Sequence, residues 1–206
     1  CQWLMLVIIA RLGDPRDVGI YSLGLAISAP IMLFLGMNLR VAIATDQQRH
    51  FNVRDYLALR VFSSVSGFLI ILLVAFLWHA GDFYDFLTIA LIALAKVVES
   101  VSDISYGFFQ QNERNDLISK SLVLRGVTTV LLLGPSYYCF RSLPASCAVV
   151  LLVWLAVLLA FDAPRLRVLS SIHVYPPCQS LGVVRLFKTV LPLGFVALLD
   201  SLTPNV

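Results

Sequence analysis

The chain has 206 residues, of which 59% are apolar and 13% are charged, and its formal net charge is +3. Soluble domains typically contain about 45 to 50% apolar and about 25% charged residues. With a mean hydropathy of +0.88, this composition excludes a soluble globular domain and predicts an integral membrane protein. The small net charge gives no reason to expect nucleic acid as a partner.

Apolar runs of transmembrane length follow one another along the chain, since a spanning helix needs about 20 such residues. A partial run ends at Ala10, and the connection at 11–19 is predicted to be a turn because it contains glycine and an Asp-Pro pair. Complete runs lie at 20–39, 57–78, 83–109, 117–140 and 144–161, and a last run starts at residue 186. The predicted fold is an all-α integral membrane protein with six helices in one bundle and the start of a seventh.

Both ends of the sequence fall inside apolar runs, so we expect a fragment of a longer protein. The segment 162–185 contains Pro164 and the pair Pro176 and Pro177, and it precedes a helix that runs in the same direction as the first. The expected division is an N-terminal bundle at 1–161 with a truncated first helix, a cytoplasmic linker at 162–185, and the truncated first helix of a second bundle at 186–206.

Basic residues are unevenly divided between the two sets of loops and helix ends. One set holds eleven of the fifteen lysines and arginines, Lys96 lies inside a span, and the other set holds only Arg11, Arg16 and Arg141. Cytoplasmic loops carry an excess of Lys and Arg. The segments 40–60, 110–125 and 162–188 are therefore predicted to be cytoplasmic.

The stretch 95–125 (AKVVESVSDISYGFFQQNERNDLISKSLVLR) is polar inside an otherwise apolar run. On a helix turning about 100° per residue, Lys96, Glu99, Asp103 and Gln110 fall on one face. Ionisable residues in a bilayer face other helices or water and mark transport paths. We predict that this face lines a cavity through which a polar molecule moves.

A purely structural role for the same residues stays open, because Lys96 and Glu99 are three residues apart and can pair. Such a pair leaves one carboxylate without a partner. An unpaired acid in a low dielectric would be protonated, bind a cation, or find an arginine on a neighbouring helix. The first two outcomes would give H⁺ or Na⁺ coupling, and no other cofactor is expected.

The sequence carries no enzyme signature, since it has no Ser/His/Asp grouping, phosphate loop or CxxC pair, and its four cysteines lack metal-ligand spacing. Cys139 and Cys147 flank an outward-facing turn, where either a disulfide or two free thiols fits the pattern. Five aromatic residues lie near the predicted outer boundary of the membrane: Tyr21, Trp78, Tyr84, Tyr137 and Tyr138. They would form an aromatic belt or stack on sugars.

Four stretches occur in a distinctive order: GDPRDVGIYSLGLAISAP, DYLALRV, KVVESVSDISYGFFQQNERNDLISKSLVLRG and VLPLGFVALLDSLTPNV. Together they resemble bacterial polysaccharide flippases of the Wzx type, in the superfamily of multidrug and oligosaccharidyl-lipid exporters. The resemblance implies two helix bundles around a central cavity that opens to one side at a time, as in MATE-like transporters. This chain would supply only the first bundle and the start of the second.

The resemblance also implies a function at the bacterial inner membrane. The expected substrate is an undecaprenyl-pyrophosphate-linked oligosaccharide, flipped to the outer leaflet for surface polysaccharides such as the O-antigen of lipopolysaccharide. Expected partners are this substrate, membrane lipids, and the polymerase and chain-length proteins of the same process.

Four further residues are candidates for the transport path. Arg40, Arg60 and Arg125 stand near cytoplasmic helix ends, and a planar guanidinium suits pyrophosphate, although membrane topology alone would also explain them. Arg125 is the strongest of the three because it lies a full turn deeper than Lys120. Asp200 lies between Pro192 and Pro204, and prolines often mark a bend near a transport site; the alternative is a misplaced helix end.

Two other functions remain in competition. A cation-coupled multidrug exporter of the same superfamily would share the fold, but the basic mouth of the cavity argues against cationic drugs. A membrane-embedded glycosyltransferase or polymerase would need a large outward loop for its catalytic residues, and the outward loops here are short. The sequence therefore favours a transporter over an enzyme.

Overall fold

The structure is a computed structural model that describes residues 2–46, 50–51, 53–78, 82–172 and 182–202. All regular elements within these ranges are helical, which confirms the predicted all-α fold. In chain order they are α1 (Gln2–Leu12), α2 (Pro15–Gly36), α3 (Leu39–Thr45), α4 (Val53–Trp78), α5 (Phe83–Gln111), α6 (Asn115–Phe140), α7 (Leu143–Val157), a π-helical turn (Leu158–Asp162), α8 (Ala163–Ile172) and α9 (Gly182–Leu202).

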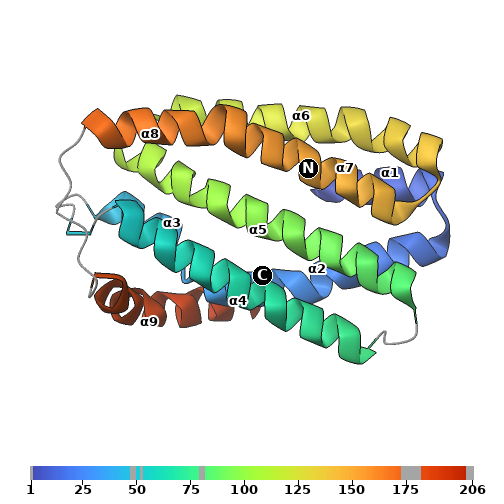
Figure 1. Cartoon of the computed structure of the whole chain (residues 1–206), viewed down its shortest axis with the longest axis horizontal. Helices are drawn as coiled ribbons and strands as arrows, with labels where there is room; N and C mark the ends of the chain where they lie inside the picture. Colours follow the sequence, from blue (N-terminus) through green and yellow to red (C-terminus); the bar gives the residue numbers. More distant parts are fainter. Residues whose placement is uncertain (1, 47–49, 52, 79–81, 173–181, 203–206) are drawn as a thin grey trace.

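The helices form an up-and-down bundle with α5 in its middle (Figure 1). In this view α6 and α7 lie on one side of α5, and α3, α4 and α9 lie on the other. Small side chains on α5, including Ser100, Ser102 and Ser105, are buried and allow its neighbours to approach closely. The central position of α5 explains how a helix with several charged residues is kept away from lipid.

Four helical segments of the described chain are long and apolar enough to cross a membrane, and they make this a multi-pass membrane protein: Pro15–Thr45, Val53–Trp78, Asn115–Phe140 and Leu143–Leu169. Helix α5 is not among them, although it is long enough, because Asp85, Lys96, Glu99 and Asp103 interrupt it. Large apolar side chains such as Leu69, Leu73 and Val123 cover the outside of the bundle, where lipid would lie.

The apolar core has two parts that meet near the middle of α5. One includes Ile71, Ile89 and Leu143, and the other includes Ile43 and Phe109. The charged residues of the predicted polar face, which we call the polar stripe, lie on α5 between these two clusters. The core therefore leaves a polar level halfway along the bundle.

The two ends of the bundle differ in their charged residues. The end of α3, the starts of α4, α6 and α9, and the ends of α5 and α8 meet at one end, which we call the basic end. Arg11, Arg16 and Arg141 lie at the other, which we call the opposite end. This arrangement is the one that the uneven charge distribution requires, and the side of the membrane on which each end lies stays a prediction.

Helix α2 begins at Pro15, so the second half of the turn predicted at 11–19 is helical. Asp14 has extended backbone angles just before it, and a proline in the first helical turn needs no N–H partner. The same span is also broken near its other end, where Met37 and Asn38 have φ values of 46° and 47° and separate α2 from α3. The sequence pattern predicted neither change.

The span predicted to end at residue 161 continues to Ile172 through the π-helical turn and α8. The π-helical turn ends two residues before Pro164, whose missing N–H interrupts the hydrogen-bond ladder of an α-helix. The first residues of the segment predicted as a linker at 162–185 are therefore helical. Residues 173–181 of that segment lie outside the described residues, and its role between two bundles stays a prediction.

Candidate functional site

Six of the eight predicted site residues line one cavity of about 420 Å³ within the described chain. We call it the charged groove. Its wall comes from α2 and α6, its charged residues come from four helices, and apolar side chains such as Met32 and Leu122 complete the lining. The six residues are Arg40 on α3, Arg60 on α4, Lys96, Glu99 and Asp103 on α5, and Arg125 on α6.

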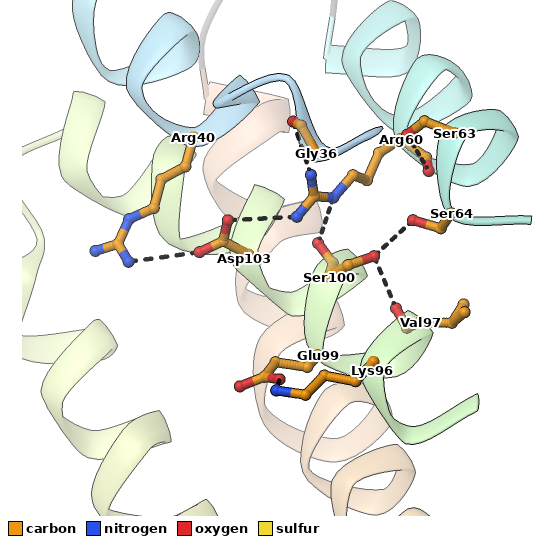
Figure 2. Close-up of polar contacts among 10 residues, drawn as sticks. All are labelled: Gly36, Arg40, Arg60, Ser63, Ser64, Lys96, Val97, Glu99, Ser100 and Asp103. Carbon is orange, nitrogen blue, oxygen red and sulfur yellow. Dashed lines mark hydrogen bonds and ion pairs between the residues drawn. The ribbon is translucent and has the colours of Figure 1, made fainter. Parts of the chain in front are cut away.

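Asp103 lies between two arginines from different helices (Figure 2). One carboxylate oxygen is 3.4 Å from Nη1 of Arg40, and the other is 3.4 Å from Nη2 of Arg60. Of the three outcomes that the sequence left open for an unpaired acid, the structure selects the arginine on a neighbouring helix. The side chain of Asp103 is one-third exposed to the groove.

The Arg60 guanidinium donates to acceptors on three sides. Nε donates to the carbonyl oxygen of Ser100 at 2.8 Å, Nη1 to the carbonyl oxygen of Gly36 at 2.9 Å, and Nη2 faces Asp103. The Gly36 carbonyl belongs to the last turn of α2, where helix carbonyls lack partners of their own and attract cations. Arg60 therefore joins the broken end of α2 to α5, and only 8% of its side chain is exposed.

Two further contacts order the α5 stripe beside this cluster (Figure 2). The hydroxyls of Ser64 and Ser100 are 2.6 Å apart and join α4 to α5. Lys96 Nζ lies 2.8 Å from Glu99 Oε2 on the same helix, as the three-residue spacing predicted. The side chain of Glu99 is 38% exposed in the groove, whereas that of Lys96 is 14% exposed.

Gly107 allows the backbone of α3 to lie directly against α5. A Cβ atom at this position would come within 3.1 Å of the Arg40 carbonyl oxygen and 3.2 Å of Ile43 Cβ. Close approach of this kind is the usual reason for glycine between membrane helices. The contact brings Arg40 to the groove, one turn of α5 from Asp103.

Arg125 is held differently from Arg60. Its Nη2 donates to the hydroxyl of Ser102 on α5 and lies 3.6 Å from Oδ2 of Asp162, and its guanidinium stacks at 5.3 Å from the centre of the Trp154 ring. Among the described residues, Nε of Arg125 and Oδ2 of Asp162 have no hydrogen-bond partner. Arg125 thus reaches the groove with hydrogen-bonding capacity to spare.

Asp162 supports Arg125 without lining the groove, and the sequence did not predict this role. It was placed at the start of a cytoplasmic linker, yet its side chain is fully buried. The π-helical turn ends at Asp162, and its other oxygen accepts a 2.7 Å hydrogen bond from Ser121, which also lies 2.8 Å from the Tyr106 hydroxyl. The sequence does contain one signal for this contact. Asp162 is an acid at the end of an apolar run, and extending that helix by one turn would bring it within reach of Arg125.

A second cavity of about 380 Å³ adjoins the charged groove. The two share Glu99, Leu122 and Arg125, and the second extends past Trp154 to Trp3 on α1. The cavity around Arg125 therefore continues along α6 towards the opposite end of the bundle, with a largely apolar lining.

The structure does not bring Gln110 to the charged groove, and it does not describe the side chain of Asp200. Gln110 is exposed near the end of α5, at the basic end, and is not among the described residues that line the cavity. Asp200 lies in α9, and its side chain is outside the part that the structure describes. The roles predicted for both stay predictions.

At the basic end, Asp46 joins the ends of three helices. Its carboxylate lies 3.0 Å from His50 Nδ1 and accepts a hydrogen bond of 3.1 Å from the Tyr56 hydroxyl, while its carbonyl oxygen accepts one of 2.6 Å from Gln111. Burial raises the pKa of Asp46, but the hydrogen bonds from His50 and Tyr56 outweigh it and the net shift is downward.

The cysteines that flank the α6–α7 turn are both free in the described structure, Cys139 exposed and Cys147 buried. Of the two alternatives, free thiols are therefore found.

Comparison with known proteins gives one distant relative. The chain matches no protein-family model and no solved structure. Over its 206 residues it is 26% identical to the capsular polysaccharide biosynthesis protein CapF of Staphylococcus aureus. The match covers 100% of this chain and 51% of CapF, so the chain spans about half the length of this relative.

Proposed function

We propose that this chain is the N-terminal bundle of a flippase that moves an oligosaccharide linked to undecaprenyl pyrophosphate across the bacterial inner membrane. The charged groove is the observation that supports this most directly, because it gathers ionisable side chains from α3, α4, α5 and α6 inside an apolar bundle. The name of CapF places that relative in capsular polysaccharide biosynthesis, and a similar role for this chain agrees with the groove.

The chemistry of the groove fits such a substrate in three parts. Arg125 and Arg40 offer guanidinium donors to the pyrophosphate, which prefers planar bidentate partners. The partly exposed Glu99 and Asp103 carboxylates can accept hydrogen bonds from sugar hydroxyls. The lipid tail would remain outside, along apolar residues such as Leu33 and Leu122 at the groove edge. Alternating access would require a second bundle to close this groove.

The charge of the groove weighs against the exporter of cationic drugs. Its lining has four basic residues and two acidic ones among the described side chains, a formal excess of two positive charges. Such a surface attracts anions and repels cations. The polymerase or glycosyltransferase alternative would place catalytic residues in outward loops, but α6 and α7 are joined by only Arg141 and Ser142. We therefore propose transport without catalysis.

The test uses the full-length protein in proteoliposomes that contain extracted lipid-linked oligosaccharide. A membrane-impermeant glycosidase measures the fraction of sugar exposed on the outer surface over time. We expect the protected fraction to become accessible in vesicles with the protein and to remain protected in protein-free vesicles. Equal protection in both would contradict the flippase, and a lengthening of the oligosaccharide would favour the polymerase.

A further inference from the structure

A second polar hollow, of about 750 Å³, lies at the opposite end of the bundle, far from the charged groove along the helices. Four segments converge there: the α1–α2 turn, the start of α5, the end of α6 and the α6–α7 turn. Its volume is within the range of roughly 300 to 1,000 Å³ that small-molecule sites occupy. The proposed path through the charged groove does not use it.

The floor of this hollow is fixed by hydrogen bonds between helices. The buried Tyr137 hydroxyl donates to the buried Asp17 carboxylate, which joins α6 to α2. The Tyr84 hydroxyl accepts a 2.9 Å hydrogen bond from the backbone N–H of Leu143. Arg16 pairs with both Asp82 and Asp85 and joins α2 to the start of α5. A ligand would meet a floor that is already organised, which lowers the entropy cost of binding.

Gly13 shows how closely the α1–α2 turn is fitted to this floor. A Cβ atom there would lie 2.5 Å from the Tyr137 hydroxyl oxygen and 2.9 Å from the Ile9 carbonyl oxygen. No side chain can be placed at that position without moving Tyr137 or the turn. The close fit keeps the Tyr137 ring at the surface of the hollow.

Above this floor, several polar groups remain free to bind a ligand. Among the described residues, the side chains of Arg11, Asp14, Tyr138 and Arg141 line the hollow, are exposed and make no hydrogen bond or ion pair. They offer two guanidinium donors, one carboxylate acceptor and one phenol. The Tyr138 side chain is 72% exposed, so one face of its ring is accessible.

The balance of these groups decides the class of ligand. The lining has three arginines and three aspartates among its described residues, so its formal charge is zero. A simple anion would meet the carboxylates, and a simple cation would meet the guanidinium groups. A molecule with many hydroxyls can donate to the carboxylates and accept from the arginines, while an apolar C–H face packs on a tyrosine ring. A saccharide has all of these features.

We propose that this hollow is a second binding site for the sugar portion of the oligosaccharide, separate from the charged groove, where Glu99 and Asp103 meet sugar hydroxyls beside the pyrophosphate. The choice of this oligosaccharide as the saccharide rests on the proposed function. Tyr138 supplies the ring on which a sugar packs, and Arg141 and Arg11 donate to its hydroxyls from the rim. The site recognises the saccharide without its lipid carrier.

The test measures binding of carrier-free oligosaccharide, released by mild acid from the lipid-linked pool, to the purified full-length protein by isothermal titration calorimetry. We expect saturable binding that weakens at least tenfold in Tyr138→Ala and in Arg141→Gln. Phe140→Ala is the matched control, because Phe140 is 61% exposed in the same last turn of α6 but does not line the hollow. This control should bind as the parent does.

Three results would overturn the proposal: no saturable binding to the parent, parental affinity in both hollow variants, or displacement of the sugar by inorganic pyrophosphate, which would indicate an anion site. A fourth result, loss of affinity in Glu99→Gln with parental affinity in Tyr138→Ala, would also overturn it by assigning the free sugar to the charged groove alone. The proteoliposome assay is independent of this one. If the protein binds the free sugar through Tyr138 and Arg141 but moves no lipid-linked oligosaccharide, the sugar site in the hollow is supported and the proposed flippase activity is contradicted.

Discussion

Two buried arginines border the charged groove, and their surroundings differ. The Arg60 guanidinium has acceptors at Nε, Nη1 and Nη2, contributed by α2 and α5. The Arg125 guanidinium donates to Ser102, stands 3.6 Å from Asp162, and has no acceptor at Nε among the described residues. Similar burial, with 8% and 7% of the side chain exposed, therefore accompanies very different hydrogen bonding.

The difference separates a residue that holds helices together from one that can bind a ligand. A ligand that binds Arg60 must take the partner from the Gly36 carbonyl and from one oxygen of Asp103, which costs desolvation energy. A ligand that binds the Arg125 guanidinium displaces fewer contacts, because among the described residues only Ser102 and Asp162 lie against it as acceptors. We therefore infer that Arg60 acts mainly on stability and Arg125 mainly on transport.

The largest effect is expected for Arg60→Ala. Removing this side chain leaves the Gly36 carbonyl and one oxygen of Asp103 without a partner, and should lower the free energy of unfolding by roughly 3 to 5 kcal/mol. Membrane abundance of the full-length protein, measured by immunoblot, should fall sharply. Arg40→Gln is the control, because the Arg40 pair is about one-third exposed and such pairs contribute about 1 kcal/mol or less. Equal losses in both variants would remove the distinction between the two arginines.

Arg125→Lys should reduce transport while abundance stays near parental. Lysine keeps a positive charge beside Asp162 but cannot present the planar fork that pyrophosphate prefers. We expect export of lipid-linked oligosaccharide to slow at least tenfold, equivalent to about 1.4 kcal/mol of lost interaction. The measurement is the proteoliposome rate divided by the amount of inserted protein. Parental export in this variant would show that Arg125 is not a ligand.

A smaller effect on stability than that of Arg60→Ala is expected at Gly107, which brings α3 and Arg40 to the groove. The Cβ atom of Gly107→Ala would press on the α3 backbone, and overpacking of this kind costs about 1 to 3 kcal/mol. Gly134→Ala on α6 is the control, because no atom lies within 4 Å of the added Cβ and alanine favours a helix by roughly 0.5 to 1 kcal/mol. Thermal unfolding in detergent should move in opposite directions for the two variants, and a shared direction would contradict the close contact.

The smallest effect concerns Asp46, whose partners lie at the basic end instead of in the membrane. Because the folded-state pKa is lowered, this carboxylate contributes stability that is present above the unfolded pKa of about 3.9 and is lost as the pH falls through the folded value. Asp46→Asn should be less stable than the parent at neutral pH, and the difference should shrink in acid. A thermal-unfolding difference that stays constant from neutral to acidic pH would contradict this role.

The sequence predicted the helices and residue positions that depend on neighbouring residues in the chain. Helices α4, α5 and α6 lie close to the predicted spans, and the polar stripe brought Lys96, Glu99 and Asp103 to one cavity. Helical periodicity is enough for these because the residues share one helix. The partners of Asp103 depend on how α3 and α4 pack against α5. The sequence therefore named the candidate arginines but did not predict which of them pair with Asp103.

The features that the sequence did not predict depend on contacts between distant segments. The break at Met37 and Asn38 has no proline or glycine at the two left-handed positions, and it is stabilised by Arg60 from another helix. Asp162 looked like the start of a linker because apolar periodicity stops there, yet Ser121 and Arg125 on α6 bind it inside the bundle. Local pattern cannot reveal a partner that lies about 40 residues earlier.

The interruption between α2 and α3 also has a mechanical consequence. The span consists of two helices that meet at Met37 and Asn38, since helical hydrogen bonding does not run unbroken across these residues. The shorter helix, α3, is fastened to α5 at Gly107 and Asp103, while the end of α2 is joined to α4 by the hydrogen bond from Arg60 to the Gly36 carbonyl. Bending of the span therefore concentrates at Met37 and Asn38, and the hydrogen bond from Arg60 to Gly36 resists a swing of α2 relative to α3.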